Sequence, residues 1–298
     1  MQAQNRRTFL KTTSTALAAG SFVGLNPSAL GANERIVLAL IGGNNQGRGV
    51  ALNAIKDGAE IKTFCDLDDA VLGRTGADLA KAQGKDPAPE KDFRRVLEDK
   101  DIQGVIIATP DHWHAIPTIL ACQAGKDVYV EKPLATTIDE GRAMLTASHK
   151  HNRIVQMGSQ WKSCTHILEA ADFVKSGKLG SVSMVRAWAW LDWQPQLESH
   201  QDGNPPPGVD YDFWLGPAPK RAFNPNRFHY NFRWFWDYAG GLMTDWGVLL
   251  INLAMWGMGP EHPKTITSCG GKFAVDDNTE TPDTQIAVYE FPTYTYIW

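Results

Sequence analysis

Short apolar runs alternate with helix-like segments through the first half of the chain, and no other feature restricts the possible fold as strongly. The apolar runs, each of strand length, lie at residues 35–41, 59–65, 104–108, 127–130 and 153–157. Segments with the apolar spacing of helices follow them, at 46–56, 69–82, 93–98, 113–124 and 138–151. Strands and helices that alternate in this way form a parallel sheet with right-handed crossovers. We therefore expect an α/β fold with a doubly wound parallel sheet over residues 34–158.

The pattern changes after residue 158. One more helical segment, 166–176, precedes a stretch at 181–193 that alternates apolar and polar residues, as half-buried antiparallel strands do. A helix is expected at 242–258, with strands at 264–273 and 284–291. Residues 159–298 should thus form an α+β domain with a mainly antiparallel, open-faced sheet. Because the chain stops within another strand-like alternation, we expect this sheet to be incomplete.

The composition is that of a folded protein with no nucleic-acid partner. The 298 residues are 43% hydrophobic, and a typical domain takes about 150 residues, so two domains are expected. The formal net charge is −4, and no basic stripe offsets it. The four cysteines lie far apart and lack CxxC or Cys/His spacing, so we expect neither a metal site nor a disulfide framework.

The first 31 residues have the order of an export signal. The segment 5–11 reads NRRTFLK and is followed by a weakly apolar stretch and then by small residues at 29–32. This is typical of a twin-arginine signal peptide, which we predict at 1–31. The apolar stretch is shorter than the ~20 residues that span a bilayer. We expect a periplasmic or otherwise exported protein, with no membrane association after removal of the signal.

A glycine-rich turn links the first apolar run to the first helical segment. Residues 42–47 read GGNNQG, where dinucleotide-binding folds have G-x-G-x-x-G. Asn44 replaces the second glycine, but asparagine tolerates unusual backbone angles, so the motif is weakened rather than abolished. At the end of the second apolar run, Asp66 would accept the adenosine ribose hydroxyls and repel a 2′-phosphate. The turn predicts NAD rather than NADP, bound by Gly42, Asn44, Gln46, Gly47 and Asp66.

Two polar runs follow neighbouring strands of the predicted sheet. TPDHWH at 109–114 comes after the strand at 104–108, and Glu131-Lys132-Pro133 comes after the strand at 127–130. A lysine at the carboxyl end of a parallel strand points into the crevice where such sheets bind ligands. Pro133 also restricts the backbone beside Lys132, as a positioned group requires. These runs therefore predict a functional site at this edge of the sheet.

The combination of TPDHWH with DVYVEKPL at 127–134 resembles the Gfo/Idh/MocA family of NAD(P)-dependent oxidoreductases, and its exported bacterial branch most of all. The resemblance runs from about residue 35 to the last residue. It implies a Rossmann fold for residues 34–158. Exported relatives generally run longer than this chain, and members of the family commonly pair through the open face of the second sheet. The resemblance thus implies that residues 159–298 serve substrate binding and oligomerisation, and a homo-oligomer is a further expectation.

The resemblance also implies roles for single residues. Lys132 would hydrogen-bond the substrate hydroxyl and stabilise the alkoxide that develops as hydride leaves. Glu131 would orient Lys132 or the ribose next to the nicotinamide, and His114 would be a positioning group close to the cofactor. Thr109 and Pro110 belong to the same cofactor-binding run.

One family segment is present only in part. Residues 240–250 correspond to D-x-x-x-H, in which an Asp and a His one helical turn apart face the substrate. Asp245 fits as a catalytic and substrate-binding residue, but Leu249 occupies the position of the His, a general acid/base typically worth ~100- to 10,000-fold in rate. Asp245, His229, His166 or Tyr230 could take the proton instead. Alternatively, the protein only binds a sugar, or the leucine is a sequence variant.

Residues 223–238 are dense in aromatic and arginine side chains within a loop-like segment. Aromatic faces with a few polar donors suit a sugar ring, because its C–H face stacks and its hydroxyls form hydrogen bonds. We therefore take Trp161, His229, Tyr230 and Asp245 as candidate substrate-binding residues. The competing interpretation is that these aromatic side chains pack a core.

Three functions follow from these patterns. The leading hypothesis is transfer of hydride between a carbohydrate or polyol and NAD, which should be tightly held because free NAD is not expected outside the cytoplasm. The second is an NAD-assisted glycosidase, in which transient oxidation of one sugar carbon permits elimination of the leaving group. The third, motivated by Leu249 and Asn44, is a carbohydrate-binding homologue with impaired catalysis.

Overall fold

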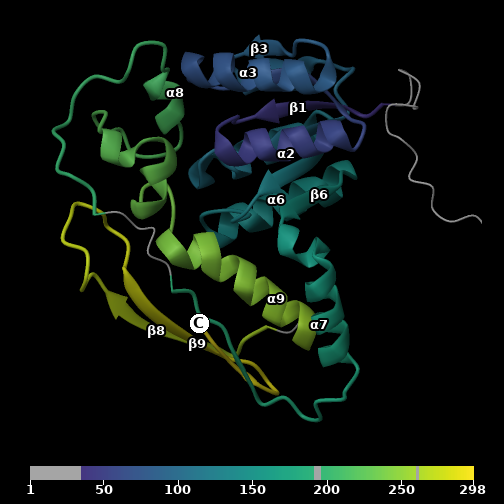
Figure 1. Ribbon diagram of the computed structural model, residues 1–298, viewed down its shortest axis with the longest axis vertical. Helices are drawn as coiled ribbons and strands as arrows, with labels where there is room; N and C mark the ends of the chain where they lie inside the picture. The colour runs from purple at the N-terminus through teal and green to yellow at the C-terminus, as the bar shows by residue number, and fades with distance from the viewer. Residues whose placement is uncertain (1–34, 191–195, 260–261) are drawn as a thin grey trace, which may run out of the picture.

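The chain forms two sheets, each packed against helices (Figure 1). The structure is a computed structural model that describes residues 35–190, 196–259 and 262–298. The predicted signal at 1–31 and the end of the predicted strand at 181–193 lie outside the described residues.

The first sheet has six strands in the order β3-β2-β1-β4-β5-β6, and all its pairings are parallel. Its strands are β1 (Val37–Ile41), β2 (Glu60–Cys65), β3 (Ala88–Glu90), β4 (Gly104–Ile107), β5 (Asp127–Glu131) and β6 (Val155–Gly158). Five of them were predicted. The sequence gives no strand signal for β3, because this strand is three residues long and contains a proline, which is tolerated at the edge of a sheet.

Four of the five described helices of the first domain begin directly after a residue whose side chain caps them, and the helix at Ala115–Gln123 is the exception. They are α2 (Asn45–Lys56), α3 (Asp69–Gln83), α4 (Phe93–Glu98), α5 (Ala115–Gln123) and α6 (Ile138–His151), and a short 3₁₀ turn, η2 (Asp111–Trp113), precedes α5. The side chains of Asn44, Asp68 and Asp92 accept from backbone N–H groups at the starts of α2, α3 and α4. Thr137 and Glu140 form a capping box on α6.

Apolar side chains cover both faces of the first sheet, as a doubly wound fold requires. Along β1, Ala39 and Ile41 belong to one core cluster, whereas Leu40 belongs to the other. The same alternation occurs in β4, where Ile106 faces away from its two neighbours. Because both faces of the sheet are covered, a ligand can reach it only at the ends of its strands.

The second domain contains several short helices and a four-stranded sheet. Its helical elements are η3 (Gln160–Ser163), α7 (Thr165–Lys175), α8 (Tyr211–Leu215), η4 (Pro225–Arg227), η5 (His229–Trp234), η6 (Met243–Gly247) and α9 (Val248–Met258). Its strands are β7 (Met184–Arg186), β8 (Thr265–Gly271), β9 (Thr284–Glu290) and β10 (Thr295–Ile297). The predicted helix at 242–258 is thus divided, because η6 is a π-helical turn before α9.

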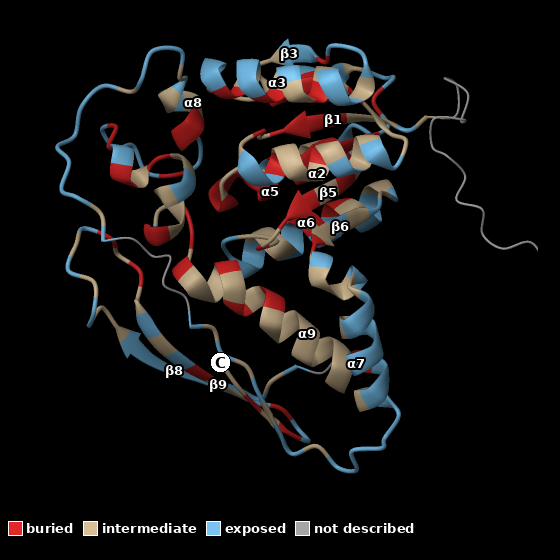
Figure 2. Ribbon diagram, viewed as in Figure 1, coloured by how far each residue is buried: buried red, intermediate tan, exposed pale blue. Residues whose placement is uncertain are grey.

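The second sheet is mixed, with the order β7-β10-β9-β8. Its β8–β9 and β9–β10 pairs are antiparallel, whereas β10 runs parallel to β7, so the alternation at 181–193 yields only a short parallel edge strand among the described residues. One face packs on α9 through Tyr296 and Phe291, whereas Ile286 on β9 is exposed. Strand β8 is exposed along most of its length (Figure 2). Across the residues that the structure describes, no helix is long and apolar enough to cross a membrane.

Candidate active site

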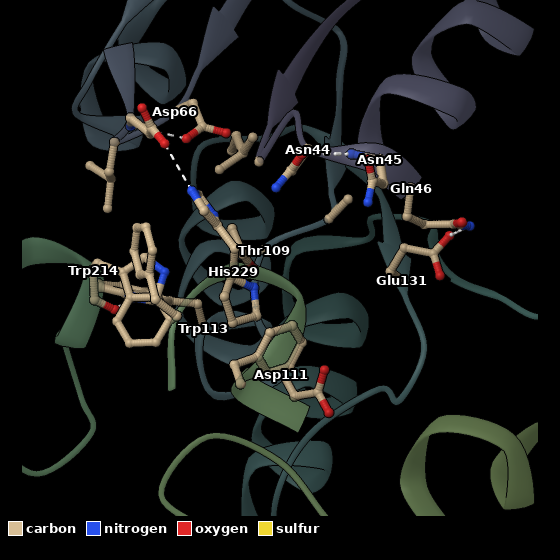
Figure 3. Close-up of a pocket in the computed structure, with 18 of the residues that line it drawn as sticks. Asn44, Asn45, Gln46, Asp66, Thr109, Asp111, Trp113, Glu131, Trp214 and His229 are labelled. Atoms are coloured by element: carbon tan, nitrogen blue, oxygen red, sulfur yellow. Dashed lines mark hydrogen bonds and ion pairs between the residues drawn. The ribbon is translucent and has the colours of Figure 1, made fainter. Parts of the chain in front are cut away.

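The candidate active site is a pocket between the carboxyl ends of the parallel strands and the second domain (Figure 3). The loops that follow β1, β2, β4 and β5 line one side of it, and residues of α8, η5 and η6 line the other. Ligands bind at this edge in doubly wound sheets. The pocket therefore brings together segments that lie as far apart in the chain as Ile41 and Asp245, which are 204 positions apart.

The glycine-rich turn is held tightly against the loop after β4. Gly42 has φ +84°, and a Cβ there would lie 2.7 Å from the carbonyl oxygen of Ala108. A Cβ on Gly47 would lie 2.0 Å from the carbonyl oxygen of Gly42, so both positions require glycine. Gly47 shapes this turn without lining the pocket, whereas Gly42 lines it.

Asn44 faces the pocket at the start of α2, where the second glycine of the motif would stand. Its Oδ1 accepts from the backbone N–H of Asn45 at 3.1 Å and from Nη2 of Arg74 at 3.0 Å. The side chain thus caps the helix and holds an arginine close to its N-terminus. A helix N-terminus with a nearby guanidinium favours a pyrophosphate.

Asp66 is fixed at the end of β2 with its carboxylate in the pocket. Its Oδ2 accepts from the backbone N–H of Gly43 at 2.8 Å, and its Oδ1 accepts from that of Asp68 at 3.1 Å. Burial raises the pKa of this carboxyl, against the opposing effect of the two backbone hydrogen bonds. Each oxygen retains a lone pair that can accept a hydroxyl group.

Lys132 and Asp245 meet in the pocket from opposite domains. The Lys132 ammonium is hydrogen-bonded and ion-paired to Oδ1 of Asp245, and both side chains are largely buried. Nε of Arg233 donates to Oδ2 of the same carboxylate at 2.9 Å. Arg233 was noted from the sequence only as part of the aromatic segment, and its position beside Asp245 depends on the fold of η5.

Glu131 connects the loop of Lys132 to the first helix. Its Oε1 accepts from Nε2 of Gln46 at 2.9 Å and from the Tyr129 hydroxyl at 3.2 Å, and its Oε2 accepts from the Lys132 backbone N–H at 3.2 Å. The structure therefore brings together two of the predicted cofactor residues, Gln46 and Glu131 (Figure 3). These hydrogen bonds fix the backbone at Lys132 relative to β5 and α2.

The loop after β4 combines residues in the pocket with a buried support. Thr109 and Pro110 line the pocket, and the Thr109 Oγ1 is a buried hydroxyl without a partner among the described residues. His114 lies behind them and does not line the pocket. Its Nδ1 is 2.6 Å from the carbonyl oxygen of Pro133, and its Nε2 is 2.9 Å from that of Thr109. Burial lowers the pKa of His114.

Asp111 is a buried acid of the pocket to which the sequence interpretation gave no role. It begins the η2 turn, only 7% of it is exposed, and it lines the pocket together with Lys132, Arg233 and Asp245. Burial raises the pKa of its carboxyl to about 8, although Lys132 and Arg233 lower it, and Asp245 raises it further. The signal available in the sequence was an acid within TPDHWH, directly after a buried strand.

The predicted substrate-binding residues do not form one group. His229 lines the pocket at its Asp66 end (Figure 3), with Nε2 2.8 Å from Oδ2 of Asp68. Tyr230 lines the pocket beside Arg233. Trp161 does not line the pocket and packs edge-on against Trp246, with ring centroids 5.3 Å apart.

The aromatic segment at 223–238 is in large part a core, so for most of its rings the competing interpretation of the sequence is the correct one. Trp234, Phe235 and Tyr238 are buried in one apolar cluster. Phe228 belongs to the same cluster and also lines the pocket, as does the partly buried Phe232. The short 3₁₀ turns of η4 and η5 allow a loop-like sequence to bury these rings.

Leu249 is buried and does not line the pocket, whereas Asp245, one turn earlier, does. The π-helical turn of η6 directly precedes the α-helix that carries Leu249. Neither His166, which is exposed on α7, nor Leu249 supplies a proton-accepting group to this pocket.

The residues present fit NAD. Asp66 offers its carboxylate to ribose hydroxyls, the turn at 42–47 and the start of α2 offer an anion site, and the unpartnered Thr109 hydroxyl offers a further polar contact. Within the described ranges, no group of three or more His, Cys, Asp and Glu side chains is arranged to hold a metal ion.

Comparison with protein families matches both domains. The sequence model of an oxidoreductase family with an NAD-binding Rossmann fold matches residues 36–159, and the model of the C-terminal alpha/beta domain of an oxidoreductase family matches residues 164–293. Together the two models account for most of the chain.

Three curated relatives have related sequences. Levoglucosan dehydrogenase of Pseudarthrobacter phenanthrenivorans is 34% identical over 108 residues, which cover 36% of this chain and 28% of that protein. A glycosyl hydrolase family 109 protein of Stenotrophomonas maltophilia is 30% identical over 229 residues, covering 74% of this chain and 49% of that protein. An alpha-N-acetylgalactosaminidase of Shewanella oneidensis is 29% identical over 155 residues, covering 50% and 34%. The chain thus spans half or less of the length of these relatives.

Two solved structures illustrate the shared fold. Levoglucosan dehydrogenase in complex with NADH and levoglucosan superposes with a TM-score of 0.67 at 20% identity, covering 89% of this chain and 66% of that one. Aldose-aldose oxidoreductase from Caulobacter crescentus, complexed with glycerol, gives 0.65 at 21% identity, covering 88% and 70%. At these identities the likeness is one of fold.

Proposed function

Because this chain belongs to the Gfo/Idh/MocA family of NAD-binding oxidoreductases, we propose that it transfers hydride between a hydroxyl or carbonyl group of a carbohydrate or polyol and a tightly held NAD. The observation that carries this proposal is the pairing of Lys132 with Asp245 in the same pocket as Asp66. A cation positioned by an acid, next to a site suited to a dinucleotide, is what oxidation of an alcohol needs.

One end of the pocket would bind the cofactor, and the other would bind the reacting group of the substrate. Asp66 and the turn at 42–47 would hold the adenosine and pyrophosphate of NAD, which supplies a nicotinamide that accepts or returns hydride. Lys132 would donate a hydrogen bond to the reacting oxygen and stabilise its negative charge. Asp245 holds Lys132 in place through one carboxylate oxygen and is itself held by Arg233 through the other.

The same proposal includes an exported location. The motif NRRTFLK within residues 1–31 supports a twin-arginine route, which carries folded proteins with their cofactors. A protein that works outside the cytoplasm must regenerate NAD in its own site, by oxidising one carbohydrate and reducing another. A preparation that exchanges NAD freely with the solvent would contradict this part.

The test is the near-ultraviolet absorbance of the nicotinamide that stays with the protein after purification from the cytoplasm. Levoglucosan, D-glucose, N-acetyl-D-galactosamine and myo-inositol serve as probes. We expect reduction of the bound cofactor by some of them, and reoxidation when a second carbohydrate with a free carbonyl is added. No change with any probe, although NAD is demonstrably bound, would leave the carbohydrate-binding homologue as the better description.

A second candidate is an NAD-assisted glycosidase, and the relationship to the glycosyl hydrolase family 109 protein favours it. This reaction would return the hydride to the same sugar, so it would release a sugar from a glycoside without net reduction of NAD. Release of nitrophenol from nitrophenyl glycosides, with the nicotinamide absorbance unchanged at the end, distinguishes it from the first proposal.

A further inference from the structure

Oxidation of a hydroxyl group releases a proton, and the residues discussed so far leave that proton without an acceptor. Leu249 is apolar and outside the pocket. Asp245 accepts from Lys132 at one carboxylate oxygen and from Arg233 at the other, so both of its oxygens are engaged with cations. His229 is engaged with Asp68 at the far end of the pocket.

Tyr230 is not suited to accept the proton either. The Arg233 guanidinium carbon lies over the Tyr230 ring, 4.1 Å from the ring centroid. Burial raises the pKa of the Tyr230 hydroxyl above its usual value. A general base works best when its pKa lies near the working pH. A tyrosine with a raised pKa is almost entirely protonated there.

Asp111 differs from all of these groups. Within the described residues, its carboxyl has a backbone hydrogen bond within its own residue but no ion pair and no hydrogen bond to another residue, although it is only 7% exposed and lines the pocket. Figure 3 shows its carboxyl group away from Asp66, at the opposite end of the residues drawn. A buried carboxyl that no other residue pairs with costs free energy, so we expect it to serve a bound molecule.

The turn that carries Asp111 is fixed from three sides. The His112 backbone N–H donates to the carbonyl oxygen of Tyr238 at 3.2 Å, and Nε1 of Trp113 donates to that of Trp214 at 2.8 Å. His114 joins the turn to the lysine loop through its contact with Pro133. Asp111 therefore has a defined position relative to Lys132 before any ligand binds.

We propose that Asp111 accepts the proton of the substrate hydroxyl, in place of the histidine that the family has at position 249. This inference rests on the proposed function. The O–H bond breaks and its proton bonds to the Asp111 carboxylate. The electron pair left on oxygen becomes the second bond of the carbonyl group, while the C–H pair leaves as hydride to the nicotinamide dinucleotide. In the reverse direction Asp111 returns the proton.

The electrostatic surroundings agree with this role. The charged groups that act on Asp111 are Lys132 and Arg233, which favour its anion, and Asp245, which opposes it. Burial outweighs them and raises the pKa of the Asp111 carboxyl to about 8. Such an acid exchanges a proton readily near neutral pH.

The first test observes the proton directly and does not depend on turnover. The infrared difference between the parent protein and Asp111→Asn is recorded across a pH titration. We expect a protonated-carboxyl band in the parent that disappears around pH 8 and is missing from the variant. Asp139→Asn, which removes an exposed carboxylate, is the control. Absence of such a band in the parent would overturn the proposal.

The second test measures reduction of the bound nicotinamide by whichever probe sugar reduces it in the parent. Asp111→Asn should slow this step ~100-fold or more while NAD stays bound, and it should lose the solvent deuterium isotope effect and the rise of rate with pH. Asp111→Glu, which keeps a carboxylate, should recover part of the rate and the pH dependence. An Asn variant as fast as the parent would refute the role of Asp111 alone, whereas a parent that reacts with no probe would refute the proposed function and this role with it.

Discussion

Lys132 and Asp245 form an ion pair across the domain boundary, although 113 positions separate them in the chain. The lysine follows a strand of the first sheet, and the acid lies in the π-helical turn before α9. The candidate active site therefore exists only when the two domains are docked. Arg233 strengthens this junction through the second oxygen of the same carboxylate.

Substitution Lys132→Ala removes the donor to the reacting oxygen. We expect the rate of nicotinamide reduction to fall ~100- to 1,000-fold, the usual loss for one donor that stabilises developing negative charge. Stopped-flow absorbance with a probe sugar measures this rate. Lys150→Ala, an exposed position on α6, should behave like the parent. Unchanged reduction in the Lys132 variant would exclude this lysine from the reaction.

Asp66→Ser removes the charged acceptor at the end of β2. Hydrogen bonds to a charged group contribute about 1.5–3 kcal/mol, so we expect NAD affinity to fall roughly 10- to 100-fold. NADP should lose less, because its 2′-phosphate no longer meets a carboxylate. Calorimetric titration of cofactor-free protein with each dinucleotide gives both constants. An unaltered ratio of the two constants would argue against Asp66 as the discriminating residue; Asp86→Ser, an exposed acid, is the control.

His229→Ala removes the contact with Asp68 that closes the adenosine end of the pocket. The histidine side chain is 36% exposed, so the contact should contribute only about 0.2–1 kcal/mol, and NAD dissociation should accelerate roughly 1.5- to 5-fold. Displacement of bound NAD by a fluorescent analogue follows this rate. His166→Ala, on the exposed side of α7, should leave it unchanged. If His229→Ala instead weakens sugar binding at constant NAD release, this residue belongs to the substrate site.

Trp234→Ala tests whether the aromatic segment is a core. Trp234 is fully buried, and replacing such a ring by alanine typically costs about 3–5 kcal/mol of unfolding free energy. Trp190→Ala is the matched control, because this ring is 93% exposed and its loss should change stability by less than about 0.5 kcal/mol. Urea unfolding followed by circular dichroism compares the two. Equal effects would contradict the packing seen around Trp234.

Asp111 also predicts a pH dependence of stability. Its carboxyl has a pKa of about 8 in the folded protein, above its value in the unfolded chain, so the folded state binds the extra proton between the two values. Stability should therefore fall as pH rises through this window, by at most about 1.4 kcal/mol per pH unit. Asp111→Asn should remove this slope. Urea midpoints measured from pH 5 to 8 test it, and equal slopes in parent and variant would mean that Asp111 is already ionised at low pH.

The sequence predicted the first domain closely because its signals are local. The alternation of apolar runs with helical segments depends only on residues near one another. The second domain was predicted less well. Its edge strand β7 has three residues and is parallel to β10, and the segment at 223–238 folds into short turns around a core. Such arrangements depend on contacts between distant segments.

By itself the sequence determined the glycine turn, Asp66 at the end of β2 and Lys132 at the end of β5, since backbone conformation and strand ends follow from neighbouring residues. Only the tertiary structure placed Arg233 beside Asp245, Trp161 outside the pocket and His229 at Asp68. It also decided that Asp111 is a buried acid with a raised pKa. The physical reason is that burial and Coulomb interactions depend on which distant segments surround a group, whereas a local pattern records only the group itself.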